Sequence, residues 1–263
     1  MNSATPASPT MPVLFMGHGS PMNAIESTRY SRAWQELGRR LPKPRAILCI
    51  SAHWYVRGTY VTGNAAPETI HDFGGFPRAL FEVQYPARGD GDLAAHIVKL
   101  LDQVPADTSQ DWGLDHGSWS VLVHLRPGAD VPVLQLSIDR RRPPSSHLAI
   151  GRALAPLRGE GILSLGSGNV THNLAHALRG GGLERPDWAT SFDHDIAQAL
   201  QQHDDAFLLR ALESEHGRMA HPSPDHYFPL LYAAGAAQPT DAITFPVEGF
   251  DLGSLSMRSV QFG

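Results

Sequence analysis

Met16-Gly17-His18-Gly19-Ser20-Pro21 places a histidine between two glycines, directly after a short apolar run. Two later apolar runs, at 46–51 and 161–165, also lead to a histidine, at His53 and His172 respectively. Short, continuously apolar runs are typical of strands that are covered on both faces, as in a parallel sheet. Three such strands that each deliver a histidine at the carboxyl end indicate one shared site.

The segments around these runs alternate between helical and strand-like patterns. An amphipathic helix is predicted at 29–41, where Trp34, Leu37 and Leu41 share one face. Further helices are predicted at 91–104, 145–157, 188–202, 204–212 and 224–235, and further strands at 60–62, 80–85, 131–137 and, as the last strand, 243–245.

This alternation predicts the α/β class: a single domain with a central, mostly parallel (mixed) twisted sheet and helices on both faces. We expect residues 1–11 to be a flexible N-terminus and residues 12–263 to form one catalytic domain. Ligands in such sheets bind beyond the carboxyl ends of the strands. His18, His53 and His172 are therefore expected to meet at that edge, in a metal site.

Composition excludes several classes of protein. Charged residues make up 18% and hydrophobic residues 42% of the 263 residues, which argues against disorder. The net charge of -5 provides no basic surface for nucleic acid or an anionic membrane, and no run approaches the ~20 apolar residues of a membrane span. The single cysteine, Cys49, cannot form an intrachain disulfide. We expect a cytoplasmic protein with neither nucleic acid nor membrane as partner; the oligomeric state stays open.

The 14 histidines point to metal or proton chemistry. His18 and His53 are favoured as metal ligands because each follows a predicted buried strand, and three imidazoles can bind zinc or iron(II) with positions left open. For His116, His172 and His226, residue type alone leaves a metal role and an ordinary hydrogen bond about equally favoured. Other histidines are predicted to be exposed in helices or loops, namely His71, His124, His147, His176, His194, His203 and His216.

Other enzyme signatures are missing from the sequence. It contains no G-x-S-x-G nucleophile elbow, Walker loop, HExxH helix or CxxC pair. Gly166-Ser167-Gly168 is a weak substitute for a nucleophile or a phosphate-binding loop. Metal chemistry at the histidines remains the favoured interpretation.

Six motifs follow one another in a fixed order: Gly17-His18-Gly19-Ser20-Pro21, Ser51-Ala52-His53-Trp54, His71-Asp72-Phe73-Gly74-Gly75-Phe76-Pro77, Gly113-Leu114-Asp115-His116-Gly117-Ser118-Trp119, Gly166-Ser167-Gly168-Asn169-Val170-Thr171-His172-Asn173-Leu174 and His221-Pro222-Ser223-Pro224-Asp225-His226-Tyr227. In these motifs the chain resembles the DODA-type extradiol aromatic ring-opening dioxygenases of the class III extradiol superfamily. The resemblance spans nearly the whole chain.

The resemblance implies a role for each site residue. His18, His53 and His226 match metal ligands, and His172 matches the histidine that acts as acid and base beside the metal. His116 matches a second active-site histidine that hydrogen-bonds substrate or oxygen. Together with its neighbour Asp115, it is expected to orient the oxygen intermediate. The residues themselves add candidates for substrate binding, namely Asp115, His221, Phe73 and Phe76. The alternative for His221 is to support a metal ligand from behind, and the alternative for the phenylalanines is core packing.

The same resemblance implies a cofactor and a reaction. Relatives that cleave protocatechuate complete their ligand set with a glutamate, whereas this chain offers His226. An all-histidine set suits zinc as well as iron. We expect Fe(II) for catalysis, because opening a catechol with O2 requires a redox-active metal, and Zn(II) is a plausible bound metal, with His172 as a fourth ligand. The expected substrates are a small aromatic diol, such as DOPA, and O2, and the product is a muconic semialdehyde.

Two alternatives use the same residues. The chain could be a metal-binding interaction protein without turnover, or a zinc-dependent hydrolase that is indifferent to O2.

Overall fold

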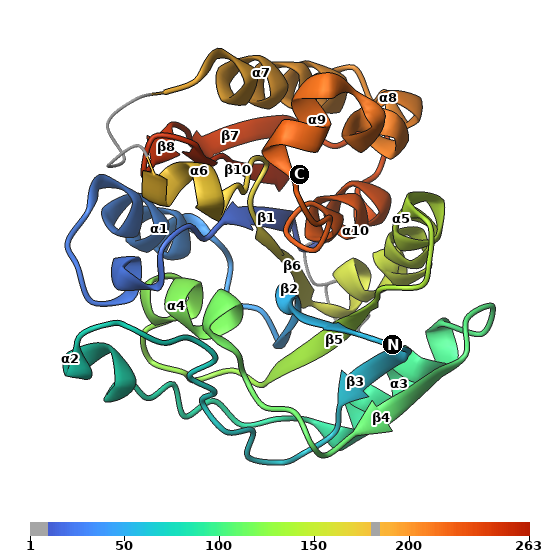
Figure 1. Ribbon diagram of the computed structural model, residues 1–263. Coiled ribbons are helices and arrows are strands. Elements are labelled where there is room, and N and C mark those ends of the chain that lie inside the picture. Colours follow the sequence, from blue (N-terminus) through green and yellow to red (C-terminus); the bar gives the residue numbers. More distant parts are fainter. Residues whose placement is uncertain (1–9, 180–184) are drawn as a thin grey trace.

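The computed structural model describes residues 10–179 and 185–263. Within them an eight-stranded mixed sheet has the order β4-β3-β5-β2-β6-β1-β10-β7 (Figure 1). Its strands are β1 (Val13–Gly17), β2 (Ala46–Val56), β3 (Thr59–Thr62), β4 (Ala106–Ser109), β5 (Val133–Asp139), β6 (Ile162–Gly168), β7 (Ile243–Val247) and β10 (Ser259–Phe262). A separate hairpin joins β8 (Phe250–Asp251) to β9 (Leu255–Ser256).

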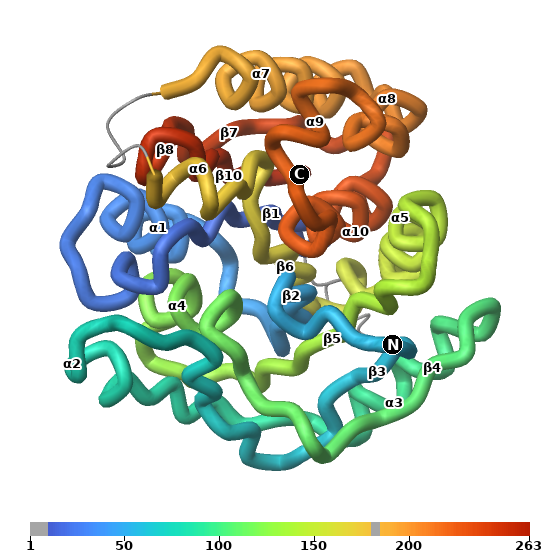
Figure 2. The backbone as a smooth tube through the Cα atoms, viewed as in Figure 1, coloured from blue at the N-terminus to red at the C-terminus, as the bar shows by residue number. Residues whose placement is uncertain are grey.

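The middle of the sheet is parallel: β1 pairs with β6, β6 with β2, and β2 with β5. β10 runs antiparallel to both β1 and β7, and β3 is antiparallel to β5 but parallel to β4. The backbone tube in Figure 2 shows β1 and β6 near the centre of the molecule, between the two outer groups of strands. The predicted fold class is confirmed.

Helices cover both faces of the sheet (Figure 1). The α-helices are α1 (Arg29–Arg40), α2 (Arg78–Phe81), α3 (Gly91–Leu100), α4 (His116–Leu125), α5 (Pro144–Leu154), α6 (Leu174–Arg179), α7 (Asp187–Gln201), α8 (Asp205–Arg210), α9 (Glu215–Ala220) and α10 (Phe228–Ala236). Short 3-10 helices are η1 (Pro21–Ala24), η2 (Ala155–Glu160) and η3 (Ala211–Glu213).

Alternation along the strands explains the two layers of core. In β1, Val13 and Phe15 point into the core beneath α3, α5, α7 and α10, whereas Leu14 and Met16 point into the core beneath α1 and α4. Successive strand residues face opposite sides, so a run that is apolar throughout must be covered twice. This is why the short apolar runs of the sequence lie in the centre of the sheet.

Helix boundaries follow local capping. α1 begins after Thr28, whose hydroxyl accepts a hydrogen bond from the amide of Ser31 while the Ser31 hydroxyl accepts one from the amide of Thr28. α3 begins after Asp90, as predicted, because the carboxylate accepts the amide of Leu93. Such caps place the helix starts close to the predicted positions.

Several predicted elements are wrong. The strand at 80–85 is absent, because Leu80 belongs to α2 and Tyr85 lies in irregular chain with its hydroxyl donating to the carbonyl of Arg126. The final strand is β10 rather than β7. His147 is fully buried rather than exposed, with Nδ1 3.0 Å from the Tyr232 hydroxyl.

The N-terminal boundary also moves slightly. Most of the predicted flexible segment, residues 1–9, lies outside the described residues. Met11 is buried, and its amide donates to the carbonyl of Arg158 at 3.1 Å, so the packed domain already includes it.

Cys49 is buried in the core, and a cytoplasmic setting stays a prediction. Among the helices that the structure describes, none has the length and hydropathy needed to cross a membrane.

Candidate active site

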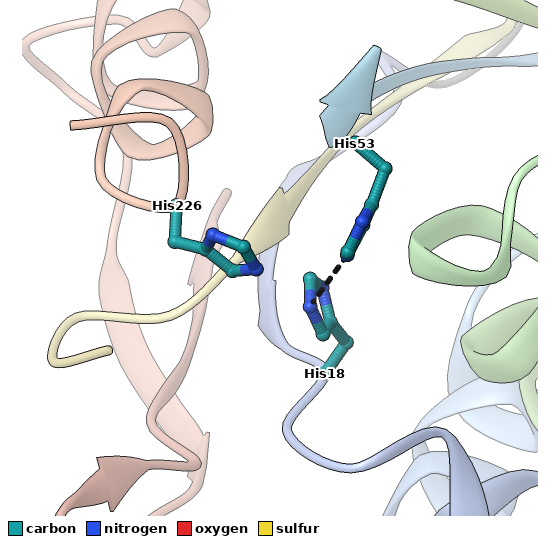
Figure 3. A group of neighbouring side chains, drawn as sticks. All are labelled: His18, His53 and His226. Carbon is teal, nitrogen blue, oxygen red and sulfur yellow. Dashed lines mark hydrogen bonds between the residues drawn. The ribbon is translucent and has the colours of Figure 1, made fainter. Parts of the chain in front are cut away.

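Three histidines from distant parts of the chain meet at the carboxyl ends of the central strands (Figure 3). His18 follows β1, His53 lies near the end of β2, and His226 lies in the loop before α10. Each offers one ring nitrogen, and these nitrogens lie within 4.8 Å of one another. The three predicted metal ligands are therefore brought together, at the edge of the sheet where the strand pattern places His18 and His53.

β2 delivers His53 through a break in strand pairing. Regular pairing of β2 with β6 ends at Ser51, and its pairing with β5 is interrupted between Ile50 and Tyr55. His53 lies inside this irregular stretch, so it does not end the strand as predicted, although it follows the last regular pair with β6. Such bulges re-aim side chains next to active sites.

The proton of His18 is held on Nδ1. Ser167, at the end of β6, donates its hydroxyl hydrogen to the carbonyl of Gly117. The same hydroxyl lies 3.0 Å from His18 Nδ1, and because its only hydrogen is already used it accepts a hydrogen bond there. Nε2 of the neutral ring is consequently left without a hydrogen.

The proton of His53 is held on the corresponding atom. Asp72 Oδ2 lies 3.2 Å from His53 Nδ1, and Asp72 Oδ1 lies 2.9 Å from both the amide nitrogen and Nδ1 of His116. A carboxylate only accepts hydrogen bonds, so both imidazoles donate from Nδ1. Nε2 of His53 then also lacks a hydrogen in the neutral ring.

These proton positions test whether the site suits a metal. Nε2 of His18 and Nε2 of His53 face each other at 3.4 Å (dashed line in Figure 3). Two nitrogen lone pairs at that separation repel unless a proton or a metal ion lies between them. Ligands at the usual Zn–N distance of about 2.0–2.1 Å would span a gap of this size. The donor set therefore fits a transition-metal ion.

Electrostatics favours neutral ligands at two of the three positions. Burial, together with repulsion from the neighbouring histidines, lowers the pKa of His18 well below its usual value. Burial also lowers the pKa of His226 to about 4. Imidazole must be unprotonated to bind a metal. Both side chains are therefore ready to act as ligands at neutral pH.

His53 differs because a carboxylate supports it. Burial opposes its protonation, but the hydrogen bond to Asp72 and the charges of Asp115 and Asp225 raise its pKa above the usual value. Burial likewise opposes ionisation of Asp72, yet hydrogen bonds from His116 and His53 hold the pKa of its carboxyl well below the usual range. Asp72 is consequently ionised throughout the neutral range.

His226 is placed by close backbone packing against β6. The amide of Asn169 donates to the carbonyl of His226 at 3.0 Å, and a Cβ on Gly168 would approach that oxygen to 2.2 Å. Only glycine permits this approach. Asp225 Oδ1 accepts the amide of His226 at 3.0 Å but lies 3.4 Å from Nδ1, which is longer than the corresponding contacts of Asp72.

His172 lies against His226, the third predicted ligand. Its ring stacks on that of His226 with centroids 3.4 Å apart and an interplanar angle of 3°. Its backbone amide donates to the carbonyl of Ala220, but among the described contacts no hydrogen bond involves its ring. Burial, followed by repulsion from His226 and His221, lowers the pKa of His172 well below its usual value. Its ring is held in place by stacking, and its nitrogens remain available.

A cavity of about 660 Å³ opens onto these rings. His116 and His172 line it together with the three predicted ligands and Asp72. Its remaining wall is largely apolar, and the larger side chains there are Phe73, Phe76, Leu174, Leu178, Leu252 and Leu255. This combination of converging polar groups and an apolar wall, in a space of this volume, is typical of a site for a small organic ligand.

Two of the predicted substrate contacts do not line the cavity. Asp115 is fully buried at the N-terminus of α4, where it accepts the amide of Ser118 and the side-chain amide of Gln135. His221 is buried with Nε2 2.8 Å from the carbonyl of Val170. Both support the loops that carry His116 and His172. Phe73 and Phe76 do line the cavity, as predicted.

Sequence reasoning missed Asp72, Ser167 and the leucines of the cavity wall. Asp72 lies in one of the six motifs, but nothing in its spacing indicates a contact with His116, 44 residues later. The pattern around Ser167 suggests only a weak nucleophile or phosphate loop, and its contact with His18 joins residues 149 positions apart. His116 was expected in a loop, and it is in fact the first residue of α4.

Comparisons with known proteins agree with this geometry. A family model described as the catalytic LigB subunit of aromatic ring-opening dioxygenase matches residues 11–251, a range that includes all five cavity histidines. The chain is 49% identical to a 4,5-DOPA dioxygenase extradiol of Escherichia coli K12, over 98% of this chain and 96% of the relative. It is 36% identical to a protein of the same name from Beta vulgaris, over 94% and 95% of the two chains.

A solved structure agrees as well. The crystal structure of an uncharacterized protein from Escherichia coli K12 superposes with a TM-score of 0.84 at 45% identity, and the match covers 96% of this chain and 100% of that one.

Proposed function

Because the chain belongs to the family of the catalytic LigB subunit of aromatic ring-opening dioxygenase and is an extradiol dioxygenase, we propose that it opens a DOPA-like catechol with O2. The metal is iron(II), held by His18, His53 and His226, and the product is a muconic semialdehyde. The observation that carries the proposal is the pair of Nε2 atoms facing each other at 3.4 Å beside an aromatic-lined cavity.

The choice of iron follows from the reaction. Iron(II) supplies a Lewis acid for the catechol oxygens and a route for electrons between ring and oxygen, and redox-inert zinc supplies only the first. An all-histidine set also binds zinc, so zinc is expected to occupy the same ligands when iron is scarce.

His172 is the proposed acid and base. Its ring lies in the cavity beside His226, without a hydrogen-bond partner among the described residues, so its nitrogens are free for the substrate. It takes the proton of a catechol hydroxyl as the substrate binds and returns a proton when the ring opens. Its low pKa keeps it neutral, and therefore able to accept that proton, before substrate arrives.

His116 is proposed to contact the substrate from the other side of the cavity. Its Nδ1 is committed to Asp72, which leaves Nε2 as the atom available to substrate or oxygen. Phe73 packs against the His116 ring with centroids 5.3 Å apart, nearly perpendicular. The aromatic wall and His116 together orient the ring of the catechol and exclude water from it.

The charge of the cavity wall indicates which substituents on the catechol ring the site accepts. Within the described residues, the cavity wall contains no lysine or arginine. A carboxylate attached directly to the catechol ring would lack a cationic partner there and would also lie near the ionised Asp72. We expect neutral substituents such as the methyl group of 4-methylcatechol to bind better than the carboxylate of protocatechuate.

The test is reconstitution. The metal-free protein is loaded anaerobically with iron(II), mixed with L-DOPA, 4-methylcatechol or protocatechuate in air, and followed by oxygen uptake and by the yellow colour of the ring-opened product. Turnover with iron and none with zinc is the expected result. A failure to consume oxygen with every catechol would overturn the proposal.

A zinc-dependent hydrolase is the second candidate, because its three-histidine ligand set would look the same. The discriminating experiment offers ester and amide substrates to the zinc-loaded protein under nitrogen. Hydrolysis that is indifferent to oxygen would favour this candidate over the dioxygenase.

A further inference from the structure

Asp72 contacts two active-site histidines through two different oxygens. Oδ1 accepts both the backbone amide and Nδ1 of His116, each at 2.9 Å, and Oδ2 lies 3.2 Å from Nδ1 of His53. The side chain is one-fifth exposed and comes from the loop between β3 and α2. The contacts thus join a metal ligand to a substrate-facing histidine.

The acceptors at this junction place one hydrogen on Nδ1 of each imidazole. The backbone amide of His116 can only donate, so Oδ1 must accept there. Both carboxylate oxygens are acceptors, so the two imidazoles each place a hydrogen on Nδ1. In the neutral rings the hydrogen is then missing from Nε2, which is the atom that faces His18 in His53 and the atom left for substrate in His116.

We propose that Asp72 is a positioning residue that sets the tautomer of both His53 and His116, and thereby keeps Nε2 of His53 open to the metal. This rests on the three-histidine metal site of the proposed function, but not on the identity of the substrate. Carboxylates that accept from the remote nitrogen of a metal-bound histidine orient that ring and raise its basicity.

The substitution Asp72→Asn makes a sharp test, because a side-chain amide has one acceptor oxygen and one donor nitrogen. The fixed backbone amide of His116 requires the amide oxygen to stay on its side, so the NH₂ group faces Nδ1 of His53. That nitrogen must then accept, which moves the hydrogen of His53 to Nε2, toward His18 and into the metal position. Asp72→Ala removes the carboxylate without imposing a donor, so His53 can adopt either tautomer.

The experiment measures zinc affinity by competition with a chromogenic chelator for the wild type, Asp72→Asn and Asp72→Ala. We expect Asp72→Asn to bind zinc about 10–100-fold more weakly than wild type, the usual consequence of losing such a partner, and Asp72→Ala to lose less. In ¹⁵N spectra of the metal-free protein, the His53 signal of Asp72→Asn should report the Nε2–H tautomer, whereas the wild type should report Nδ1–H.

The matched control is Asp225→Asn. Asp225 is also a carboxylate beside a ligand, but its Oδ1 lies 3.4 Å from Nδ1 of His226. This control removes the same charge from the neighbourhood of the metal without forcing a donor onto His53, so its loss of affinity should be smaller than that of Asp72→Asn. Thermal unfolding of each metal-free variant verifies that it is folded, and Asp72→Asn should unfold no earlier than Asp72→Ala.

The outcomes separate this inference from the proposed function. The role of Asp72 would be overturned if the wild type binds zinc and Asp72→Asn binds it as tightly as Asp72→Ala, or more tightly. An unchanged tautomer of His53 in Asp72→Asn would also overturn it. A wild type that binds neither zinc nor iron would instead overturn the metal site itself. Equal losses in Asp72→Asn and Asp225→Asn would assign the effect to charge alone and would also reject the proposed role.

Discussion

On one side of the cavity, which we call the bonded wall, His18, His53 and His116 each have a side-chain partner for Nδ1, supplied by Ser167 or Asp72. On the other side, the stacked wall, His172 and His226 lie face to face, 3.4 Å apart. The bonded wall specifies where each proton lies, whereas stacking holds ring planes in place and leaves the protons free. The proposed function, which requires both metal binding and proton transfer, uses both arrangements.

The two walls also differ in the secondary structure that carries their histidines. His53 lies in β2, and His18 directly follows β1, where its amide donates to the carbonyl of Gly168 in β6. His172 and His226 lie in loops beyond β6 and before α10. Residues on strands are placed more accurately than residues on loops. Under the proposed function, His18 and His53 of the bonded wall bind the metal together with His226, and His172 of the stacked wall transfers protons.

The strongest loss of activity should come from breaking the stacked wall. His172→Ala should lower the turnover number by about 10²–10⁴, the usual contribution of an acid and base, with the iron content unchanged. Steady-state oxygen uptake and metal analysis of the same preparation measure the two quantities. If iron is lost together with activity, His172 acts as a ligand, and the division between the walls is wrong.

A smaller effect is expected on the bonded wall. Ser167→Ala removes the acceptor for Nδ1 of His18 and should weaken zinc binding about tenfold, the lower end of the usual range, because the ring keeps its place beside β6. Ser164→Ala in the same strand is the control, since Ser164 is buried and its hydroxyl has no partner among the described residues. Chelator competition compares them, and equal affinities would remove Ser167 from the bonded wall.

The smallest effect is expected from His147, a buried histidine outside both walls, and it concerns stability rather than the site. Burial lowers the pKa of His147 to about 4, below the usual value near 6.5. As the pH falls, His147 takes up a proton at a higher pH in the unfolded chain than in the folded one. The stability that depends on neutral His147 is therefore complete above pH 6.5 and declines as the pH falls toward 4.

His147→Asn should therefore flatten the loss of stability between about pH 7 and pH 5, measured by urea unfolding, and leave zinc affinity at about pH 7.5 unchanged. Parallel pH profiles for variant and wild type would contradict this. A change in zinc affinity would show that His147 also affects the metal site, so that the contacts of the two walls do not control it alone.

Prediction from the sequence succeeded where the signal is local. The apolar runs predict β1, β2 and β6, and the histidines that follow them line one cavity at the carboxyl edge, as expected for parallel strands. Prediction failed at 80–85, where a short apolar stretch fits a strand or a buried turn equally well. The assignment of Asp115 and His221 to substrate contact rested on proximity in sequence to His116 and His226, and proximity does not specify which way a side chain points.

Local patterns in the chain were enough to specify the α/β fold, the carboxyl edge of the sheet as the site, and His18 and His53 as candidate ligands, because strand burial and glycine-flanked turns depend on neighbouring residues. The candidate roles of His116, His172 and His226 came from the resemblance to a family. The positions of the protons on those histidines depend instead on long-range packing. They require the register of β1 with β6, in which Met16 pairs with Ser167, and a loop that brings Asp72 to residues 19 positions before it and 44 after it. Hydrogen bonds across such separations follow from packing of the whole domain, which no local pattern records.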